Sequence, residues 1–302
     1  MKIKTDSVSQ NRERTKLKMQ NAGIKKIKRG GVPVKAVHPK GVEKSYYSKL
    51  YKLARILVSE VKESILPKLP DFYKSYNQEI GQYTDDYSGD IRRTIQNVSF
   101  RVAIVYNRNA NSIASDIADQ TEQFQKRQYE KQMYSVLGIN PISEEPYLKP
   151  MMDAFVATNV DLITSIPTSY FTQLEGMIKS GIQQGVSMKD LQRDILDSVT
   201  FKPVERTKAS KTGFRVINPV KRSRLIAIDQ TNKFYGSLQK VRQSQAGISR
   251  YIWRTSKDER VRETHVAREG KVFTWEKGSE IGTHPGQEIQ CRCIAEPIFD
   301  DF

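Results

Sequence analysis

The stretch from Ile91 to Phe124, IRRTIQNVSFRVAIVYNRNANSIASDIADQTEQF, decides the fold class of this chain. It belongs to a longer segment, between Gly89 and Gly138, that contains no glycine or proline, the residues that most often interrupt a helix. Its apolar residues recur at helical spacing: Ile91, Ile95, Val98, Val102 and Val105, then Ile113, Ile117 and Phe124. At about 1.5 Å per residue, the spacing predicts a helix on the order of 70 Å long. We expect the stripe at 91–105 to be the buried face of a helical bundle.

Outside the N-terminal 45 residues and the basic loop at 202–219, most of the chain up to Gly247 is also predicted to be helical. Apolar spacing predicts helices over 43–65 (ended by Pro67), 147–165, 169–184, from the N-cap residue Ser187 onward, and 221–245. We expect Pro167 to separate the second and third of these. Three short runs after Gly247, at 251–255, 271–275 and 292–295, are rich in aromatic and β-branched residues and favour strands. The predicted fold class is therefore α+β and mainly α-helical, with long helices in a helical body and a small β-containing C-terminal lobe.

The composition of the chain limits its function. The 302 residues carry a net charge of +16, which makes a polyanion such as nucleic acid the default partner. No segment approaches the roughly 18 consecutive apolar residues of a membrane span. The basic N-terminus lacks the apolar segment of a secretory signal, and two cysteines exclude a disulfide-built scaffold.

Two segments carry the excess charge. Residues 1–45 hold thirteen Lys or Arg against three Asp or Glu, and residues 202–224 hold eight against one, so the remaining body is nearly neutral. We divide the chain into a basic extended arm (1–45), a long-helix region (46–145), a second helical part (146–245) and a small α+β lobe (246–302).

The charge density of these two segments, without any base-reading motif, indicates contact with the phosphate backbone of DNA. The arm lacks a helical period, and we expect it to be disordered until its charge is neutralised. A solvated tail is one alternative, and a membrane-surface helix is another, disfavoured because the arm has no Leu, Phe or Trp face. The residues expected to bind DNA are Lys25, Lys26, Lys28, Arg29, Lys202, Arg206, Lys208, Lys211, Arg215, Lys221, Arg222 and Arg224.

Four potential metal ligands gather near the C-terminus: His265, His284, Cys291 and Cys293. Two thiolates and two imidazoles make a closed tetrahedral shell for structural zinc, which would stabilise a lobe too small for a large core. The alternative is a pair of small buried cysteines beside two hydrogen-bonded histidines. A Cys291–Cys293 disulfide is disfavoured because so short a ring is strained.

A second cluster comprises Asp258, Glu259 and His265. Two carboxylates and an imidazole can hold a divalent metal and a general base for phosphodiester cleavage. The alternative, which we favour, is a charged turn in which Asp258 caps a short helix and Arg260 or Arg262 bridges to carboxylates.

Several segments, taken in order, resemble a known family. They are 224–235, 251–265 with its Trp253 and Asp258-Glu259-Arg260, Gly270-Lys271-Val272-Phe273, His284-Pro285-Gly286 and Cys291-Arg292-Cys293. Together they resemble the head morphogenesis domain of the phage Mu F type, found in minor head proteins of tailed bacteriophages. The resemblance covers residues 146–298 and leaves the long-helix region as a partner-binding or spacer element.

The resemblance implies a non-enzymatic minor head protein that acts in head morphogenesis at the portal and contacts packaged double-stranded DNA non-specifically. Its implied partners are the portal protein and the scaffolding or major capsid proteins, which the stripe at 91–105 would contact, with no membrane. Its implied location is the interior of the virion capsid, after assembly in the host cytoplasm. Two alternatives stay open: a metal-dependent nuclease that uses Asp258, Glu259 and His265, and a DNA-binding protein with no role in the capsid.

Overall fold

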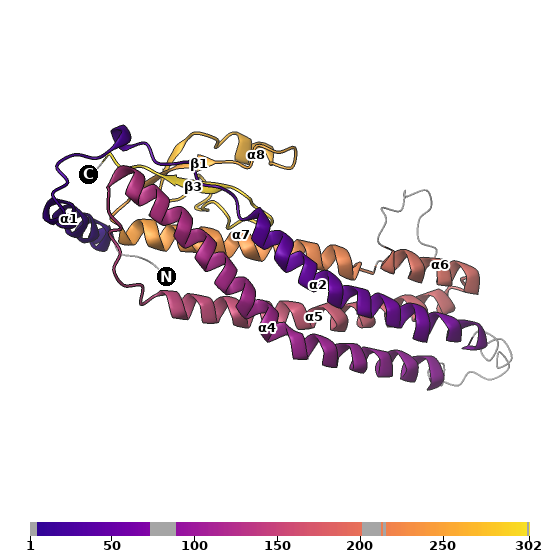
Figure 1. Ribbon diagram of the computed structural model, residues 1–302. Coiled ribbons are helices and arrows are strands. Elements are labelled where there is room, and N and C mark those ends of the chain that lie inside the picture. The colour runs from indigo at the N-terminus through magenta and orange to yellow at the C-terminus, as the bar shows by residue number, and fades with distance from the viewer. Residues whose placement is uncertain (1–4, 73–88, 201–212, 214–215, 301) are drawn as a thin grey trace. The chain divides into compact units, whose positions relative to one another are not determined.

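A computed structural model describes residues 5–72, 89–200, 213, 216–300 and 302 (Figure 1). The helices and strands are α1 Thr5–Asn21, η1 Arg29–Gly31, α2 Lys40–Glu60, η2 Val61–Ile65, η3 Leu66–Lys68, α4 Gly89–Val136, α5 Leu148–Gln183, α6 Met188–Val199, α7 Pro219–Gln245, β1 Arg250–Arg254, α8 Glu263–Val266, β2 Val272–Thr274 and β3 Ile294–Pro297. The predicted mainly helical α+β class is confirmed, as are the long helix and the three C-terminal strands.

Contacts divide the chain into two compact units. Unit 1 combines residues 1–45, 115–155 and 228–302, and unit 2 combines residues 46–114 and 156–227. The four consecutive domains predicted from the sequence do not coincide with these units, because α2, α4, α5 and α7 each contribute residues to both. A helix can continue past the point where its contacts change from one unit to the other, as α4 does along a segment without Gly or Pro after Gly89.

Unit 2 is built from stretches of long helices that bury their apolar faces. The stripe on α2 is fully buried at Leu50, Ala54 and Leu57, and it continues to Val61 in η2. Tyr46 on α2 donates a hydrogen bond from its hydroxyl to Asn159 Oδ1 on α5, at 2.8 Å. After Glu60 the α-helix gives way to the single turns η2 and η3, where Pro67 ends the predicted helix.

The predicted stripe on α4 is buried over its first four members. Ile91, Ile95, Val98 and Val102 are at most 3% exposed, whereas Val105 is only partly buried and Tyr106 takes its place at 0%. A straight helix drifts relative to a seven-residue repeat, so the buried line moves by one position along α4.

The prediction that Pro167 separates two helices is wrong. The single helix α5 runs through Pro167. An internal proline costs about 3 kcal/mol, but Ile163 and Ile166 beside it are at most 1% exposed. Burial of each such side chain contributes roughly 1.5–3 kcal/mol, which offsets the cost.

Unit 1 contains an antiparallel sheet in the order β2-β1-β3. Tyr251 pairs with Phe273 on one side and Trp253 pairs with Ala295 on the other. The sheet and α7 are joined through polar side chains: Gln243 donates to Ala295 O at 3.0 Å and accepts from Trp275 Nε1 at 3.1 Å. Both tryptophans and both cysteines lie in the apolar cluster of this sheet, which also contains Tyr251 and Ala295.

A second core of unit 1 holds the N-terminal helix. Met19 on α1 packs in one cluster with Tyr129, Met133, Ile248 and Phe299. Thr15 donates to Ala246 O at 3.0 Å. Helix α1 approaches Gly247 so closely that a Cβ there would lie 2.3 Å from Arg12 Cα, and Gly247 has φ +85°. Only glycine meets both conditions.

The expectation of an extended, disordered arm is wrong for the described residues 5–45. Residues 5–21 are helical, and Ile24 and Ile27 pack against the cluster that contains Met19. Lys25, Lys26 and Lys28 are exposed between and after them, and Lys28 N donates to Val136 O at 2.7 Å. The sequence between α1 and η1 thus alternates between apolar anchors and exposed lysines.

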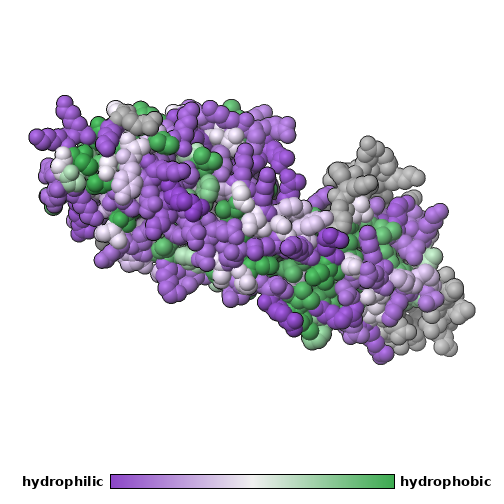
Figure 2. All heavy atoms as spheres, in the orientation of Figure 1, coloured by the Kyte–Doolittle hydropathy of each residue, from purple (hydrophilic) through white to green (hydrophobic). Residues whose placement is uncertain are grey.

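The face drawn in Figure 2 is covered mainly by hydrophilic side chains, as the mean hydropathy of −0.60 predicts. No helix in the described part of the chain contains an apolar stretch long enough to cross a membrane.

Candidate metal centre

Two cysteines and one histidine form a buried cluster beneath the sheet of unit 1. His265 Nδ1 lies 3.7 Å from Cys291 Sγ and 3.4 Å from Cys293 Sγ. All three residues are at most 4% exposed. Within the described residues, they are the one group of three or more His, Cys, Asp or Glu side chains whose ligand atoms lie within 4.8 Å of one another.

The spacing of these atoms fits tetrahedral zinc. Zinc binds sulfur at about 2.3 Å and imidazole nitrogen at about 2.0–2.1 Å, which places tetrahedral S and N ligands about 3.6 Å apart. The two N–S distances of 3.7 and 3.4 Å bracket that value. The donor set therefore fits the metal in chemistry and in distance.

The loop before β3 explains how a Cys-x-Cys sequence can offer both sulfurs to one ion. Gln290, directly before Cys291, has φ +55°, which turns the chain sharply. The backbone N–H groups of Gly286 and Cys293 donate to Cys291 Sγ at 3.4 and 3.5 Å. The Cys293 thiol lowers the pKa of Cys291 most, followed by His265 and these two backbone bonds, against burial, which raises it; the sulfur of Cys291 is therefore the better thiolate of the two.

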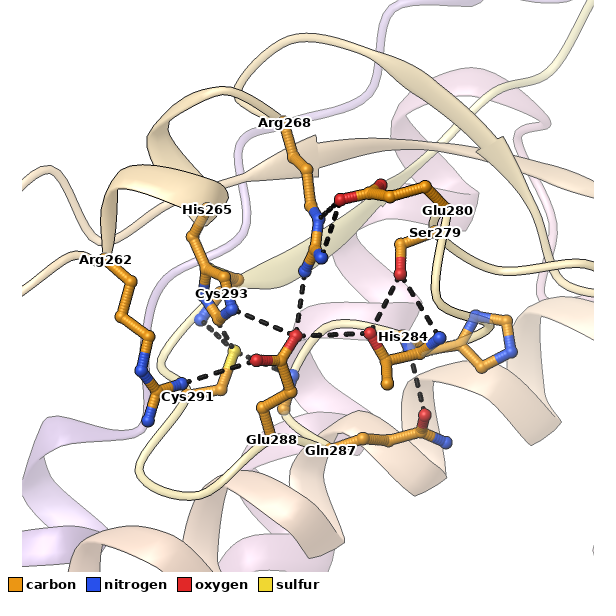
Figure 3. A network of polar contacts seen from close by, with 12 residues as sticks. Arg262, His265, Arg268, Ser279, Glu280, His284, Gln287, Glu288, Cys291 and Cys293 are labelled. Atoms are coloured by element: carbon orange, nitrogen blue, oxygen red, sulfur yellow. Dashed lines mark hydrogen bonds and ion pairs between the residues drawn. The ribbon is translucent and has the colours of Figure 1, made fainter.

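The other side of the His265 ring is held by a carboxylate. His265 Nε2 lies 3.1 Å from Glu288 Oε1, the same oxygen that accepts a hydrogen bond from Arg268 at 2.8 Å (Figure 3). Burial alone would raise the pKa of Glu288, but the bonds from Arg268 and His265 lower it to about 2. A carboxylate on the far nitrogen of a histidine is the usual support of a metal-binding imidazole, since it fixes which nitrogen faces the metal.

His284 does not belong to this cluster, contrary to the prediction. Its ring points away from the two cysteines (Figure 3) and contacts Lys240 and Tyr251. Lys240 Nζ lies 2.9 Å from His284 Nε2, and the Tyr251 hydroxyl lies 3.0 Å from Nδ1. Burial, together with the charge of Lys240, lowers the pKa of His284 to about 4. Three of the four predicted ligands, His265, Cys291 and Cys293, are therefore close enough to one another to share a metal ion.

The second predicted cluster is a charged turn, but Asp258 does not cap a helix, because α8 begins after Arg262 and has no side-chain cap. The carboxylate of Asp258 forms an ion pair with Arg292 at 2.9 Å and accepts a hydrogen bond from the backbone N–H of Arg260. Glu259 is exposed, and the ring of His265 is directed to the cysteines and Glu288. Among the described residues, Asp258, Glu259 and His265 do not form a metal-binding group.

A cavity of about 190 Å³ lies beside the three ligands. Its lining includes His265, Cys291 and Cys293 together with three arginines, Arg260, Arg262 and Arg292. Two of the arginines are neutralised: Arg292 by Asp258 at 2.9 Å, and Arg262 by Glu288 at 3.5 Å. No carboxylate of the described residues lies within 4.0 Å of the Arg260 guanidinium.

The predicted DNA-binding residues have different environments. Lys25, Lys26, Lys28, Lys221 and Arg224 are exposed. Arg222 is half-buried and donates from Nη2 to Ser165 Oγ at 2.9 Å, so part of its guanidinium serves the fold. Arg29 lies in η1, and the remaining five residues, Lys202, Arg206, Lys208, Lys211 and Arg215, lie outside the described residues.

Sequence reasoning missed the residues that support the cluster. Glu288 orients His265, and Arg268 holds Glu288 while its guanidinium lies 4.9 Å from the centre of the Trp253 ring. Neither residue has a distinctive spacing from the cysteines. His38 was set apart by its distance in the sequence, yet the charges of Arg292 and Cys291 both act on its pKa, which burial lowers.

Residues 172–296 match the family described as phage Mu protein F like protein. The predicted resemblance is thus confirmed over this segment, which contains α6, α7, the sheet and all three ligands. It is shorter than the predicted range of 146–298.

A curated relative of the chain is an uncharacterized protein of Haemophilus influenzae, 30% identical over 160 residues, which are 53% of this chain. The chain spans about a third of the length of that relative, with 32% covered. No solved structure matches the chain.

Proposed function

We propose that this protein is a minor head protein of a tailed bacteriophage and acts in head morphogenesis at the portal. The observation that carries the proposal is the Mu F-like segment at 172–296. In this proposal the protein has a structural, non-enzymatic role and resides inside the capsid, after assembly in the host cytoplasm.

Docking on the portal, scaffolding or major capsid proteins requires an exposed apolar surface. The stripe at 91–105 does not serve this purpose, because its first four members are buried within unit 2. Phe100 and Ile104 lie one turn apart on the exposed side of α4, with 68% and 41% exposure. They are the better candidates for contact with a head subunit.

The test is the incorporation of the protein into particles. We expect mass spectrometry of purified virions to find the wild-type protein and the control Asn97→Asp, since Asn97 is an exposed polar residue of the same helix. Phe100→Asp introduces a charge at the proposed contact and should reduce incorporation severalfold. Virions that lack the wild-type protein would refute the proposal and favour a DNA-binding protein outside the capsid.

We further propose non-specific contact with packaged DNA through the lysines between α1 and η1. Lys25, Lys26 and Lys28 are exposed and separated by Ile24 and Ile27, whose packing against the core holds their backbone in place. Lysine neutralises phosphate charge without reading bases.

The salt dependence of DNA affinity tests this contact. Each neutralised phosphate contributes about 0.9 to the slope of log K against log salt concentration, so replacing Lys25, Lys26 and Lys28 by Gln should reduce the slope by about 2–3. The control replaces Lys257, Lys271 and Lys277 by Gln, which removes equal charge from exposed sites elsewhere in unit 1. Equal slopes in the two triple variants would contradict the proposed contact.

A structural metal, with zinc as the best fit, is a second proposal. It is favoured by the N–S distances of 3.7 and 3.4 Å and by the carboxylate on the far side of the His265 ring. Bound zinc would link the loop before β3 to α8 and stabilise the small sheet.

Metal analysis of the purified protein tests this proposal. We expect about one zinc per chain in the wild type and in His284→Gln, and a loss of most of the metal in Cys291→Ser and Cys293→Ser. A wild-type protein without any transition metal would refute the proposal.

A further inference from the structure

The cavity beside the metal centre differs from the surroundings of a closed structural zinc site. A closed site has four protein ligands, whereas this cluster offers His265, Cys291 and Cys293 within 4.8 Å of one another. His284, the fourth candidate by sequence, is engaged by Lys240 and Tyr251 instead.

Among the described residues, no other His, Cys, Asp or Glu brings a ligand atom within 4.8 Å of all three. Glu288 contacts the opposite nitrogen of His265, and its carboxylate is already held by Arg268 and Thr283. Ser256 and Gln290 line the cavity, but a neutral hydroxyl and an amide are not among the usual ligands of zinc. A three-ligand shell with one remaining position is the arrangement of zinc sites that bind an external ligand.

The cavity has the size and the charge to hold a small anion as the external fourth ligand. Its 190 Å³ far exceed the roughly 30 Å³ of one water and are below the roughly 300–1,000 Å³ of sites for drug-sized molecules. Two thiolates balance the charge of a zinc ion, so the arginines decide the charge of the cavity. Arg262 and Arg292 have carboxylate partners, whereas Arg260 keeps its positive charge for the cavity.

We infer that the metal centre keeps one coordination position open to this cavity, and that the position receives a phosphate monoester whose other oxygens are bound by Arg260. This inference rests on the proposed metal. Arginine binds phosphate through two parallel N–H donors, and a metal adds a bond that a phosphodiester, with less charge, forms less well. The monoester can be inorganic phosphate or the terminal phosphate of a DNA strand.

Cobalt substitution tests the inference, because Co²⁺ in a sulfur-containing tetrahedral site absorbs visible light and the bands change when a ligand binds. We expect added phosphate to shift the bands of the full-length cobalt protein in a saturable way. Arg260→Ala should weaken phosphate binding by about tenfold or more, as loss of a charge-assisted hydrogen-bond donor does. Arg93→Ala, which removes an exposed arginine from α4, should leave it unchanged.

The two sources of the ligand are separated by three further titrations with inorganic phosphate, a 5′-phosphorylated oligonucleotide and the same oligonucleotide with a 5′-hydroxyl. A response to inorganic phosphate alone assigns the site to the free ion, and a response to the 5′-phosphate as well assigns it to DNA ends. An equal response to the 5′-hydroxyl oligonucleotide would overturn the assignment to a monoester.

Failure of the inference is distinguishable from failure of the metal proposal. A protein that binds neither zinc nor cobalt overturns both. Bound cobalt whose spectrum does not respond to phosphate overturns the inference alone. Loss of cobalt in a folded His284→Gln variant would mean that His284 completes a closed shell, which also overturns the inference.

Discussion

Protonation of His284 should destabilise the fold in mildly acidic solution. The ring is 5% exposed, and its Nε2 faces the Lys240 ammonium group at 2.9 Å. Nε2 therefore accepts a hydrogen bond, and Nδ1 carries the proton shared with the Tyr251 hydroxyl. A second proton would have to lie on Nε2, against the positive charge of Lys240.

The size of the effect follows from the pKa of His284, which burial lowers from 6.5 to about 4. Above pH 6.5 the folded and unfolded chains both carry a neutral imidazole. As the pH falls from 6.5 toward 4, the unfolded chain binds a proton that the folded chain excludes, so the stability falls. At about 1.36 kcal/mol per pKa unit, the loss between pH 7.5 and 4.5 is about 2.5 kcal/mol.

Urea unfolding of the wild type and of His284→Gln at both pH values measures this contribution. Other titrating groups, and any bound metal, affect both proteins alike, so the difference between their two pH-dependent changes isolates His284. We expect the wild type to lose about 2.5 kcal/mol more than the variant between the two pH values. The protein has only three histidines, so the His284 ring can also be followed by NMR. Equal losses in the two proteins, or a ring that titrates near 6.5, would refute the reasoning.

Three other substitutions have defined outcomes. Gly247→Ala should destabilise the protein by about 3 kcal/mol or more in thermal unfolding, whereas Gly270→Ala, with similar φ but open space, should cost only about 1–2 kcal/mol; equal losses would contradict the close approach of α1. Arg242→Leu leaves two carboxylates without their buried guanidinium partner, so urea unfolding should show a loss of about 3–5 kcal/mol, and a loss near zero would mean that this ion network does not stabilise unit 1. Glu288→Gln should weaken zinc affinity by about 10–100-fold in a chelator competition, and unchanged affinity would exclude Glu288 as the support of the ligand imidazole.

Local patterns in the sequence predicted where helices and strands lie better than they predicted where each one ends or which residues it packs against. The absence of Gly and Pro between 89 and 138 was sufficient for α4, and Ser187 caps α6 as predicted by accepting from Asp190 N at 3.2 Å. Pro167 misled the prediction because the burial of its neighbours is decided by tertiary packing.

The same limit explains the N-terminal segment. Met19, Ile24 and Ile27 are too few to give a helical period, and they become a core only against residues more than a hundred positions away, such as Tyr129 and Phe299.

For the candidate site, proximity in the sequence predicted four ligands, and the structure brings three of them together. His265, Cys291 and Cys293 converge because the end of β1, which leads to α8, pairs with the start of β3, which directly follows the cysteines: Arg254 lies opposite Ile294. His284 is as close to Cys291 in sequence as a ligand needs to be, but its loop packs on α7, where a Cβ on Gly236 would lie 2.4 Å from Pro285 O. No pattern within one sequence predicts this contact between Pro285 and Gly236.

Because Ile24 and Ile27 pack against the core, DNA binding at the lysines beside them should affect the stability of the fold. A polyanion that binds a loosely tethered tail leaves the melting temperature of the folded body unchanged, because the tail is equally available before and after unfolding. Lys25, Lys26 and Lys28 lie next to partly buried isoleucines that pack against the core, so their arrangement is lost when the body unfolds. Duplex DNA bound by these lysines is a ligand of the native state, so it should raise the melting temperature of unit 1. The increase should become smaller as the salt concentration rises.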